Sequence, residues 1–224
     1  MLIIAHIESS YREKFGTPRQ SGLVDGTARI VFTPDYRQPE ALRGIEGFDY
    51  LWLLWLFDRN ADVPYSPTVR PPRLGGNSRV GVFATRSPYR PNPVGLSSVR
   101  LLGIEPTADR GHTLLVAGAD LVHGTPILDI KPYLPYTDAH PDARSGFAPG
   151  APDSPLQVDD PQGLLAALPD VLRTQLRQSL AQDPRPHYQD DPDRTYRMHF
   201  ADRDVAFQVR GDRLVITDMN VKKS

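Results

Sequence analysis

Apolar residues in the first 130 positions fall in short runs, which predicts strands rather than long helices. Turn-forming residues separate these runs, and no helix of ten residues is expected between them. The segment 50–57 is apolar on both faces and is expected to be a buried strand. The seven predicted strands are residues 2–8, 29–33, 50–57, 80–85, 97–104, 113–118 and 127–130. Seven short strands of this kind predict a mainly β fold built on an antiparallel β-barrel.

Proline and glycine indicate the connections between the strands. Residues 63–77 are crowded with both, so this segment is predicted to be loop. Residues 39–48 are expected to hold one or two helical turns that end at Gly44 and Gly47.

The composition changes after residue 140. Residues 141–162 are rich in Pro, Asp, Gly and Ser and are typical of a linker. Leucines then recur at helical spacing over residues 164–180, which predicts one amphipathic helix of about 18 residues. Strands are expected at 196–200, 205–209 and 214–216, with a hairpin turn at Gly211 and Asp212. This pattern predicts a small C-terminal α+β domain.

Cysteine is absent, which excludes disulfides, thiol nucleophiles and cysteine-ligated metals. The six histidines are far apart in the sequence and show no metal-ligand spacing, so no metal site is expected. The first ten residues do not have the pattern of a signal peptide, and no apolar run is long enough to cross a membrane. A cytoplasmic protein without a membrane partner is therefore expected.

Charge is unevenly distributed, although the net charge is only −1. Residues 63–104 contain no Asp or Glu, but six arginines: Arg70, Arg73, Arg79, Arg86, Arg90 and Arg100. An acid-free stretch of arginines favours an anionic ligand such as phosphate or the RNA backbone. Solvated arginines that gather by chance are the alternative.

The same stretch is rich in proline and glycine around its arginines. Rigid prolines restrict the backbone that presents each guanidinium group, which suits a preorganised anion site. Chain turns at barrel corners would also explain the glycines. No Gly-rich dinucleotide fingerprint, Walker A sequence or nucleophile elbow is present.

Several long strings in this region resemble the TrmO (TsaA-like) family of tRNA adenosine methyltransferases. They are YREKFGTPRQSGLV, RGIEGFDYLWLLWLF, TVRPPRLGGN, GVFATRSPYRPNPVG and DLVHGTPILDIKPYLP, and the likeness resumes at LAQDPRP. The resemblance implies an S-adenosylmethionine-binding β-barrel that works as a homodimer. It also implies methylation of the exocyclic nitrogen of threonylcarbamoyl-adenosine, next to the anticodon of threonine tRNA. The expected domains are a barrel over 1–145, a linker over 146–162 and an α+β domain over 163–224.

The resemblance also implies a set of cofactor-binding residues. Arg86 is expected to hold the methionine carboxylate in a bidentate pair, with an exposed strand end as the alternative. Leu96 is expected to shape the adenine pocket or else to pack in the core. The full set is Arg19, Gln20, Phe57, Asp58, Arg86, Leu96, Gly118, Ala119, Asp120 and Leu121. The chain departs from the family pattern at Asp58 and Arg59, where many members have His-Gln, and at His123, where Asp is common.

Methyl transfer to a urea-like nitrogen is helped by a proton acceptor. Asp129, Lys131 and Tyr133 are the catalytic candidates, but Asp129 and Lys131 would equally suit a structural ion pair, and the threonyl carboxylate of the substrate is a third possible acceptor. Contacts with tRNA phosphates are expected from Arg70, Arg73, Arg79 and Arg90. Two other functions stay open: a binding module without turnover, and a small-molecule methyltransferase.

Overall fold

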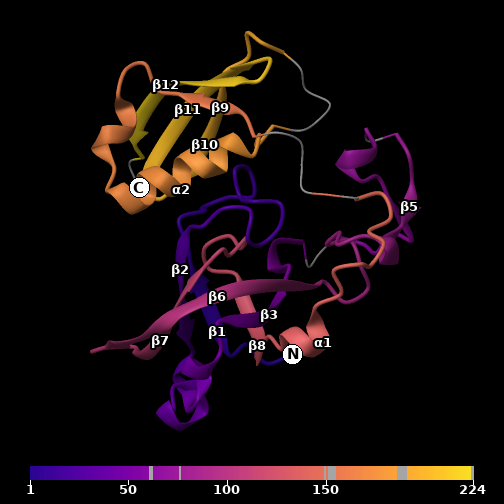
Figure 1. Ribbon diagram of the computed structural model, residues 1–224, viewed down its shortest axis with the longest axis vertical. Coiled ribbons are helices and arrows are strands. Elements are labelled where there is room, and N and C mark those ends of the chain that lie inside the picture. The colour runs from indigo at the N-terminus through magenta and orange to yellow at the C-terminus, as the bar shows by residue number, and fades with distance from the viewer. Residues whose placement is uncertain (61–62, 76, 149, 151–154, 186–190, 223–224) are drawn as a thin grey trace.

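A computed structural model describes residues 1–60, 63–75, 77–148, 150, 155–185 and 191–222. Most of its regular structure is β-strand, which confirms the expected mainly β fold. Two sheets dominate. Figure 1 shows the larger one in the lower half, and above it a four-stranded sheet with helix α2 (Asp170–Ala181).

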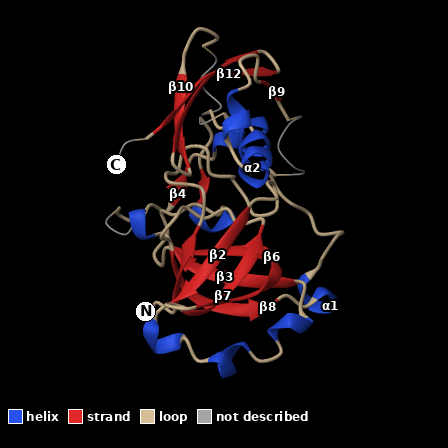
Figure 2. Ribbon diagram, turned by 90° about the vertical axis from the view of Figure 1, so that its left-hand side faces the viewer, coloured by secondary structure: helices blue, strands red, loops and turns tan. Residues whose placement is uncertain are grey.

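Six antiparallel strands form the larger sheet, which closes into a barrel because β8 pairs back with β1. The order is β1 (Ala5–Glu8), β2 (Thr27–Phe32), β7 (Gly111–Ala117), β6 (Val94–Thr107), β3 (Tyr50–Leu56) and β8 (Pro126–Pro132). Figure 2 shows these strands crossing one another from the side. Between β2 and β3 the chain makes three short 3-10 turns, η1 (Pro34–Tyr36), η2 (Pro39–Leu42) and η3 (Ile45–Gly47), as expected for 39–48.

Alternating side chains fill the interior of the barrel. Ile7 of β1 and Leu51 and Leu53 of β3 are fully buried and belong to one apolar cluster. The other face of β3 points outward, and Tyr50 on that face is 44% exposed. The expectation that this strand is buried on both faces was therefore wrong for its outer face.

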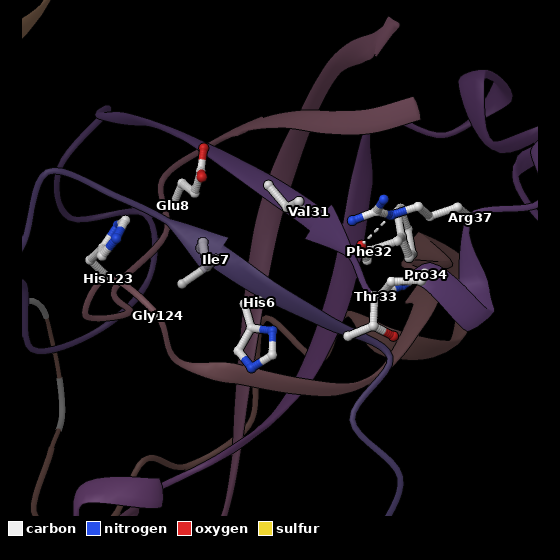
Figure 3. A pocket seen from close by; sticks show the side chains of 10 residues that line it. All are labelled: His6, Ile7, Glu8, Val31, Phe32, Thr33, Pro34, Arg37, His123 and Gly124. Carbon is white, nitrogen blue, oxygen red and sulfur yellow. Dashed lines mark hydrogen bonds between the residues drawn. The ribbon is translucent and has the colours of Figure 1, made fainter. Parts of the chain in front are cut away.

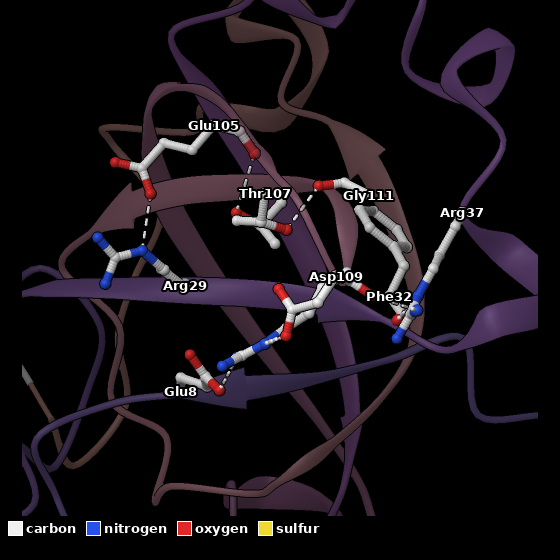
Figure 4. Close-up of polar contacts among 10 residues, drawn as sticks. Glu8, Arg29, Phe32, Arg37, Glu105, Thr107, Asp109 and Gly111 are labelled. Carbon is white, nitrogen blue, oxygen red and sulfur yellow. Dashed lines mark hydrogen bonds and ion pairs between the residues drawn. The ribbon is translucent and has the colours of Figure 1, made fainter.

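Two ion pairs connect the β6–β7 hairpin to its neighbours (Figure 4). Arg29 of β2 donates from Nε to Oε2 of Glu105 at 2.7 Å, and Arg110 in the hairpin turn pairs with Glu8 of β1. All four side chains are at least one-third exposed. Each pair is therefore worth at most about 1 kcal/mol and contributes mainly to the register of these strands.

The prediction of a barrel strand at 80–85 was wrong. Only β5 (Val80–Gly81) is a strand there, and it pairs with β4 (Thr68–Val69) in a small ribbon outside the barrel. The 3-10 turn η6 (Val82–Ala84) follows directly. Prolines at 67, 71 and 72 limit how far the partner segment can extend. That segment also contains η5 (Pro72–Leu74), so it is not entirely loop as predicted.

The second sheet has the order β10 (Tyr196–Phe200), β11 (Arg203–Arg210), β12 (Arg213–Val221) and β9 (Gln157–Asp159). β9 lies inside the predicted linker 146–162. The second sheet therefore begins before the predicted end of that linker. It pairs in parallel with β12, with Leu214 opposite Val158. Only three residues extend here, too few for an alternating pattern to stand out among the surrounding prolines and acids.

The predicted helix over 164–180 is two elements. Residues Leu164–Ala167 form the 3-10 turn η7, and α2 begins only at Asp170. Pro169 explains the break, since a residue before proline is disfavoured in the helical conformation. Leu168 is accordingly extended, with φ −100° and ψ 146°.

The segment after β1 packs into the core of the second sheet. Tyr11 and Phe15 lie in the same apolar cluster as Phe200 and Phe207. The hydroxyl groups of Tyr11 and Ser179 of α2 are 3.1 Å apart, within hydrogen-bonding distance. The amide of Ala201 donates to the carbonyl of Ser10 at 2.7 Å. The two sheets are thus joined through one early loop. A helix able to span a bilayer is not found in the described part of the chain.

Candidate functional site

Four connecting segments meet at the end of the barrel that faces the second sheet. Strands β1, β3 and β7 end here, and β2, β6 and β8 begin here, because neighbouring strands run antiparallel. The segments are 17–22, 57–60, 85–93 and 118–121. Two backbone hydrogen bonds connect them: the amide of Gly22 donates to the carbonyl of Gly118 at 2.9 Å, and that of Phe57 to the carbonyl of Pro93 at 2.8 Å.

Arg86 lies in the loop after η6 rather than at the end of a strand, so the alternative offered for it was wrong. Its Nη1 donates to Oε1 of Gln20 at 2.6 Å. The loop itself is held by Arg90, whose Nη1 donates to the carbonyls of Thr85 and Ser87 at 3.1 and 3.2 Å. The structure therefore brings together Arg86 and Gln20, which the sequence had placed in one site.

Arg19 contacts the part of the chain that follows α2. Its Nη2 donates to the carbonyls of Asp183 and Arg185 at 3.0 and 2.9 Å. Partial desolvation lowers the pKa of Arg19, whereas the nearby Asp183 carboxylate raises that pKa. The Asp183 and Arg185 side chains form a two-bond pair, with both donor–acceptor distances 2.9 Å. The C-terminal part thus fixes the loop that carries Arg19 and Gln20.

A hydrogen-bonded row at the mouth of the barrel ends at Asp120. The indole nitrogen of Trp55 donates to Oγ of Ser97 at 3.0 Å, and that hydroxyl donates to Oδ1 of Asp120 at 2.6 Å. Burial raises the pKa of the Asp120 carboxyl above its ordinary value of 3.8, while Ser97 and the charge of Arg86 lower it. The Asp120 carboxyl group is therefore close to the loop that carries Gln20 and to the loop that carries Arg86.

The residues on either side of Asp120 are buried. Ala119 and Leu121 are 4% and 1% exposed and belong to the core cluster of the barrel. Gly118 has φ +82°, a left-handed conformation that favours glycine. A Cβ atom there would be 3.5 Å from the backbone of Gly22. Ala119 and Leu121 therefore support the site from the core of the barrel, and the carbonyl of Leu121 accepts a hydrogen bond of 2.9 Å from Oγ of Ser9.

Leu96 projects outward and is 48% exposed, so the alternative of core packing was wrong. It stands opposite Leu54 of β3, which in turn stands opposite Asp129 of β8. Residues opposite one another share a face, so Leu96 and Asp129 lie on the outer surface with their Cα atoms about 10 Å apart. Ser97, the next residue, points inward and is 1% exposed.

The catalytic candidates lie on the same outer face. Lys131 Nζ is 2.8 Å from Oδ2 of Asp129, and their side chains are 61% and 45% exposed. The ring of Tyr133 packs against those of Trp52 and Tyr50, with centroid distances of 5.4 and 6.2 Å. These contacts favour the ion-pair interpretation of Asp129 and Lys131.

The three departures from the family pattern are close together in space. Asp58 begins η4 (Asp58–Asn60), where Arg59 donates from Nη2 to the carbonyl of His123 at 3.5 Å and from Nη1 to that of Arg12 at 3.3 Å. Desolvation lowers the pKa of His123, and Arg12 and Arg59 lower it further. Phe57, just before, packs on Trp55 with a centroid distance of 4.2 Å. Asp58, Arg59 and His123 thus lie together where η4 meets the chain before β8.

The four arginines expected to contact tRNA have different surroundings. Arg73 donates to the carbonyl of Gly150 at 2.8 Å, and Arg79 to Oγ1 of Thr68 at 2.8 Å. Arg90 holds the Arg86 loop. Of the six arginines in 63–104, only Arg100 lies within ion-pair distance of a described carboxylate, that of Asp25. Among the described residues, Arg70, Arg73, Arg79 and Arg90 therefore have no ion-pair partner, whereas Arg86 is close enough to Asp120 to lower the pKa of that carboxyl group.

A hollow of about 310 Å³ lies elsewhere, over the outside of β1 and β2 (Figure 3). His6, Arg37 and His123 line it together with Glu8, whose charge is balanced by Arg110. It contains none of the residues expected to bind the cofactor or to act in catalysis. In the described ranges no three His, Asp or Glu side chains are grouped so that they could hold a metal ion.

Sequence reasoning missed the residues that support this site. Ser97 and Trp55 were seen only as parts of strands, and only the pairing of β3 with β6 makes them neighbours. The signal that was available is Gly95, which stands opposite Trp55. A Cβ atom at this glycine would overlap the indole ring, so a glycine in a strand indicates a bulky cross-strand partner.

Comparisons with known proteins agree over nearly the whole chain. Residues 6–139 match the model of the tRNA-methyltransferase O N-terminal domain, and 160–222 match that of the TrmO C-terminal domain. A tRNA (adenine(37)-N6)-methyltransferase of Escherichia coli K12 is 42% identical over 92% of this chain and 91% of its own. One from Eikenella corrodens is 50% identical over 78% and 99%. A crystal structure of TrmO from Pseudomonas aeruginosa has a TM-score of 0.76 at 35% identity, covering 97% and 96%.

Proposed function

The chain belongs to the TrmO family, and from this premise we propose that it methylates N6 of adenine 37 in tRNA with S-adenosylmethionine as the methyl donor. The similarity extends over both parts of the chain and most of the length of its relatives. Within this proposal, the acceptor is threonylcarbamoyl-adenosine of threonine tRNA, and the enzyme acts in the cytoplasm, where tRNA is found. The barrel, residues 1–145, is the cofactor-binding domain, and the chain from β9 onward forms the appended one.

The observation that carries the proposal is the cluster of Gln20, Arg86 and Asp120 at the barrel mouth. S-adenosylmethionine supplies an electrophilic methyl group on a positively charged sulfur. Its other parts are a carboxylate, an ammonium group and an adenosine. The exposed Arg86 guanidinium suits a carboxylate, and the Asp120 carboxyl group suits a nearby positive charge. The tight backbone around Gly118 suits close approach by an adenine edge. These residues fit the cofactor.

Proton transfer at the acceptor nitrogen requires a group that can receive a proton. The Asp129 carboxylate is paired with Lys131 at 2.8 Å and is exposed to water. It lies about 10 Å from Leu96 along the outer face, whereas Asp120 lies inside the barrel mouth. We therefore assign Asp129 and Lys131 a structural role. This leaves the threonyl carboxylate of the substrate as the favoured acceptor.

The RNA is proposed to lie along the acid-free loops. Arg70, Arg73 and Arg79 are located there without carboxylate partners among the described residues, so they are available for phosphates. Arg90 acts mainly by holding the loop of Arg86, since it donates to two carbonyls of that loop.

We further propose that two copies associate through the outer face of β3 and β6. Tyr50, Leu96 and Leu102 are 44%, 48% and 40% exposed and are spaced along this face. Exposed apolar patches of this kind commonly mark interfaces. Because Leu96 is also a cofactor candidate, this interface would adjoin the site.

The test is methyl transfer from labelled S-adenosylmethionine to tRNA from cells that lack the modification, followed by digestion to nucleosides. Label in methylated threonylcarbamoyl-adenosine supports the proposal. Cofactor binding without transfer would instead make the chain a binding module. Transfer only to small acceptors would make it a small-molecule methyltransferase. Light scattering with and without Leu96→Glu tests the dimer separately.

A further inference from the structure

Three aromatic rings stand exposed on the loops between β3 and β6. Phe83 is 72% exposed, Tyr65 49% and Tyr89 36%. These loops carry the β4–β5 ribbon, which projects sideways from the barrel in Figure 1. A phenylalanine with nearly three-quarters of its surface in water contributes little to folding, so its position calls for another explanation.

The outward direction of Phe83 is fixed by its neighbour. Val82 is 1% exposed, and its amide donates to the carbonyl of Pro67 at 3.0 Å. The amide of Thr85 then donates back to the carbonyl of Val82 at 3.1 Å, which closes the η6 turn. Burial of Val82 within this turn leaves Phe83 on the solvent side.

The same hydrogen-bonded loops place the other two rings nearby. The amide of Ser66, next to Tyr65, donates to the carbonyl of Tyr89 at 3.5 Å. The hydroxyl of Ser66 also donates to the carbonyl of Thr68 at 2.7 Å. Tyr65 and Tyr89 therefore belong to one loop cluster with the ribbon and with η6.

The charged side chains in the segment that carries these rings are all positive. Residues 63–104 contain arginines but no acid, and the side chains of Arg70 and Arg79 have no carboxylate partner among the described residues. Unpaired bases stack on aromatic rings, while nearby arginines bind the phosphates. Exposed rings among unneutralised arginines favour single-stranded RNA over an apolar protein partner.

We propose that Phe83, with Tyr65 and Tyr89, stacks on unpaired bases of the RNA loop that contains the target adenine. This inference rests on the proposed function and names the residues that recognise the substrate. Arg86 is three residues after Phe83 and bonds to Gln20 of the cofactor site. A base stacked on Phe83 would thus be next to the methyl donor, and the loop would be opened for transfer.

The experiment compares Phe83→Ala and Phe83→Trp with Tyr136→Ala, an 87% exposed aromatic residue of α1 (Pro135–Asp138). The probe is the anticodon stem-loop of threonine tRNA with a fluorescent adenine analogue in its loop. Phe83→Ala should bind about 5- to 150-fold more weakly, the usual effect of losing one stacked base. The fluorescence change should shrink and the salt dependence should stay the same, because no phosphate contact is lost. Phe83→Trp should bind like the parent, as should Tyr136→Ala.

Arg79→Ala serves as the contrasting variant, and it should reduce the salt slope by about 1. Parent-like affinity of Phe83→Ala, in a protein that methylates tRNA normally, would overturn stacking and leave the proposed function intact. Loss of self-association instead of RNA affinity would overturn it too, by assigning Phe83 to a protein interface. A parent protein that neither binds the stem-loop nor methylates tRNA would overturn the proposed function itself.

Discussion

Arg86 donates a hydrogen bond of 2.6 Å to the side chain of Gln20, although 66 positions separate them in the chain. The bond joins the loop after η6 to the loop before β2. A guanidinium group has five donors, so Arg86 keeps others for a ligand while Gln20 fixes its direction. In the proposed function this pair would be preorganised to bind the carboxylate of the cofactor.

Replacing Arg86 by alanine should weaken cofactor binding about 10- to 150-fold. This range corresponds to one charged hydrogen-bonded contact of about 1.5–3 kcal/mol. Isothermal titration calorimetry with S-adenosylmethionine measures it. Arg43→Ala is the matched control, because Arg43 follows η2 at the opposite end of the barrel. Equal affinities for both variants would remove Arg86 from the cofactor site.

The turn at Asp183 should act on the same site from the C-terminal part. Asp183→Asn keeps a residue that tolerates the left-handed φ of 47° but removes the charge that pairs with Arg185. The carbonyls that hold Arg19 should then shift, and cofactor affinity should fall roughly two- to tenfold, as for one weakened hydrogen bond. Calorimetry reads the affinity, and hydrogen exchange of residues 17–22 reads the loop.

Asp193→Asn is the control for this change. It makes the same chemical change in a different ion pair, that of Asp193 with Arg210, in which the two side chains are 87% and 64% exposed. If both asparagine variants bind the cofactor equally well, the Asp183 turn does not position Arg19.

Asp129→Asn and Lys131→Met should each leave kcat within a few-fold of the parent. The pair is exposed, and such pairs are worth at most about 1 kcal/mol. Single-turnover methylation of tRNA is the measurement. A drop of about 100-fold or more in Asp129→Asn alone, typical of a lost general base, would make Asp129 the proton acceptor after all.

The extent to which the sequence predicts this molecule depends on the range of each interaction. Strands such as β3 and β6 are visible from local runs, and the arginine-rich loops from composition. The row from Trp55 through Ser97 to Asp120 is invisible before β3 and β6 pair, because its members are 42 and 23 positions apart. Local patterns also misled. Residues 80–85 have the composition of a strand, but the one strand that pairs with them in the described ranges, β4, is two residues long.

The C-terminal part shows the same limit. The leucine spacing over 164–180 predicts a helix correctly from Asp170 onward, and Pro169 could have indicated where it begins. The strand β9 has no such signal, because a parallel partner, β12, more than fifty positions away defines it. The contact between Arg19 and Asp183 likewise joins distant positions in the chain and gives no local signal in the sequence.

Asp120 should make stability depend on pH. Burial raises the pKa of this carboxyl group above 3.8 in the folded protein. Between 3.8 and the raised value, the folded state binds more protons than the unfolded chain, so the free energy of unfolding falls as the pH rises. Asp120→Asn has no carboxyl group to titrate, so it does not lose free energy of unfolding in this way. Its stability relative to the parent should therefore increase as the pH rises through that window. Urea unfolding at pH values from about 4 to 7 measures the difference.

Ser97→Ala provides the cross-check. The hydroxyl of Ser97 lowers the pKa of Asp120 by donating to the carboxylate, so its removal should extend the upper end of this window to higher pH. A constant difference between parent and Asp120→Asn at every pH would mean that Asp120 titrates as it does in water.

Gly16 tests how the early loop is seated on the second sheet. Its φ is +84°, and a Cβ atom would lie 3.0 Å from Sδ of Met198 and closer still to its methyl carbon. Gly22 is the matched control, with φ +78° and nothing within 4 Å of a Cβ atom. Gly22→Ala should lower the free energy of unfolding by about 1–2 kcal/mol from the backbone alone. Gly16→Ala should lose about 1–3 kcal/mol more, since Met198 is buried and must move. Urea denaturation of both variants gives the comparison. Equal losses would show that this loop does not pack tightly on β10, and the joining of the two sheets would then rest on Tyr11 and its neighbours.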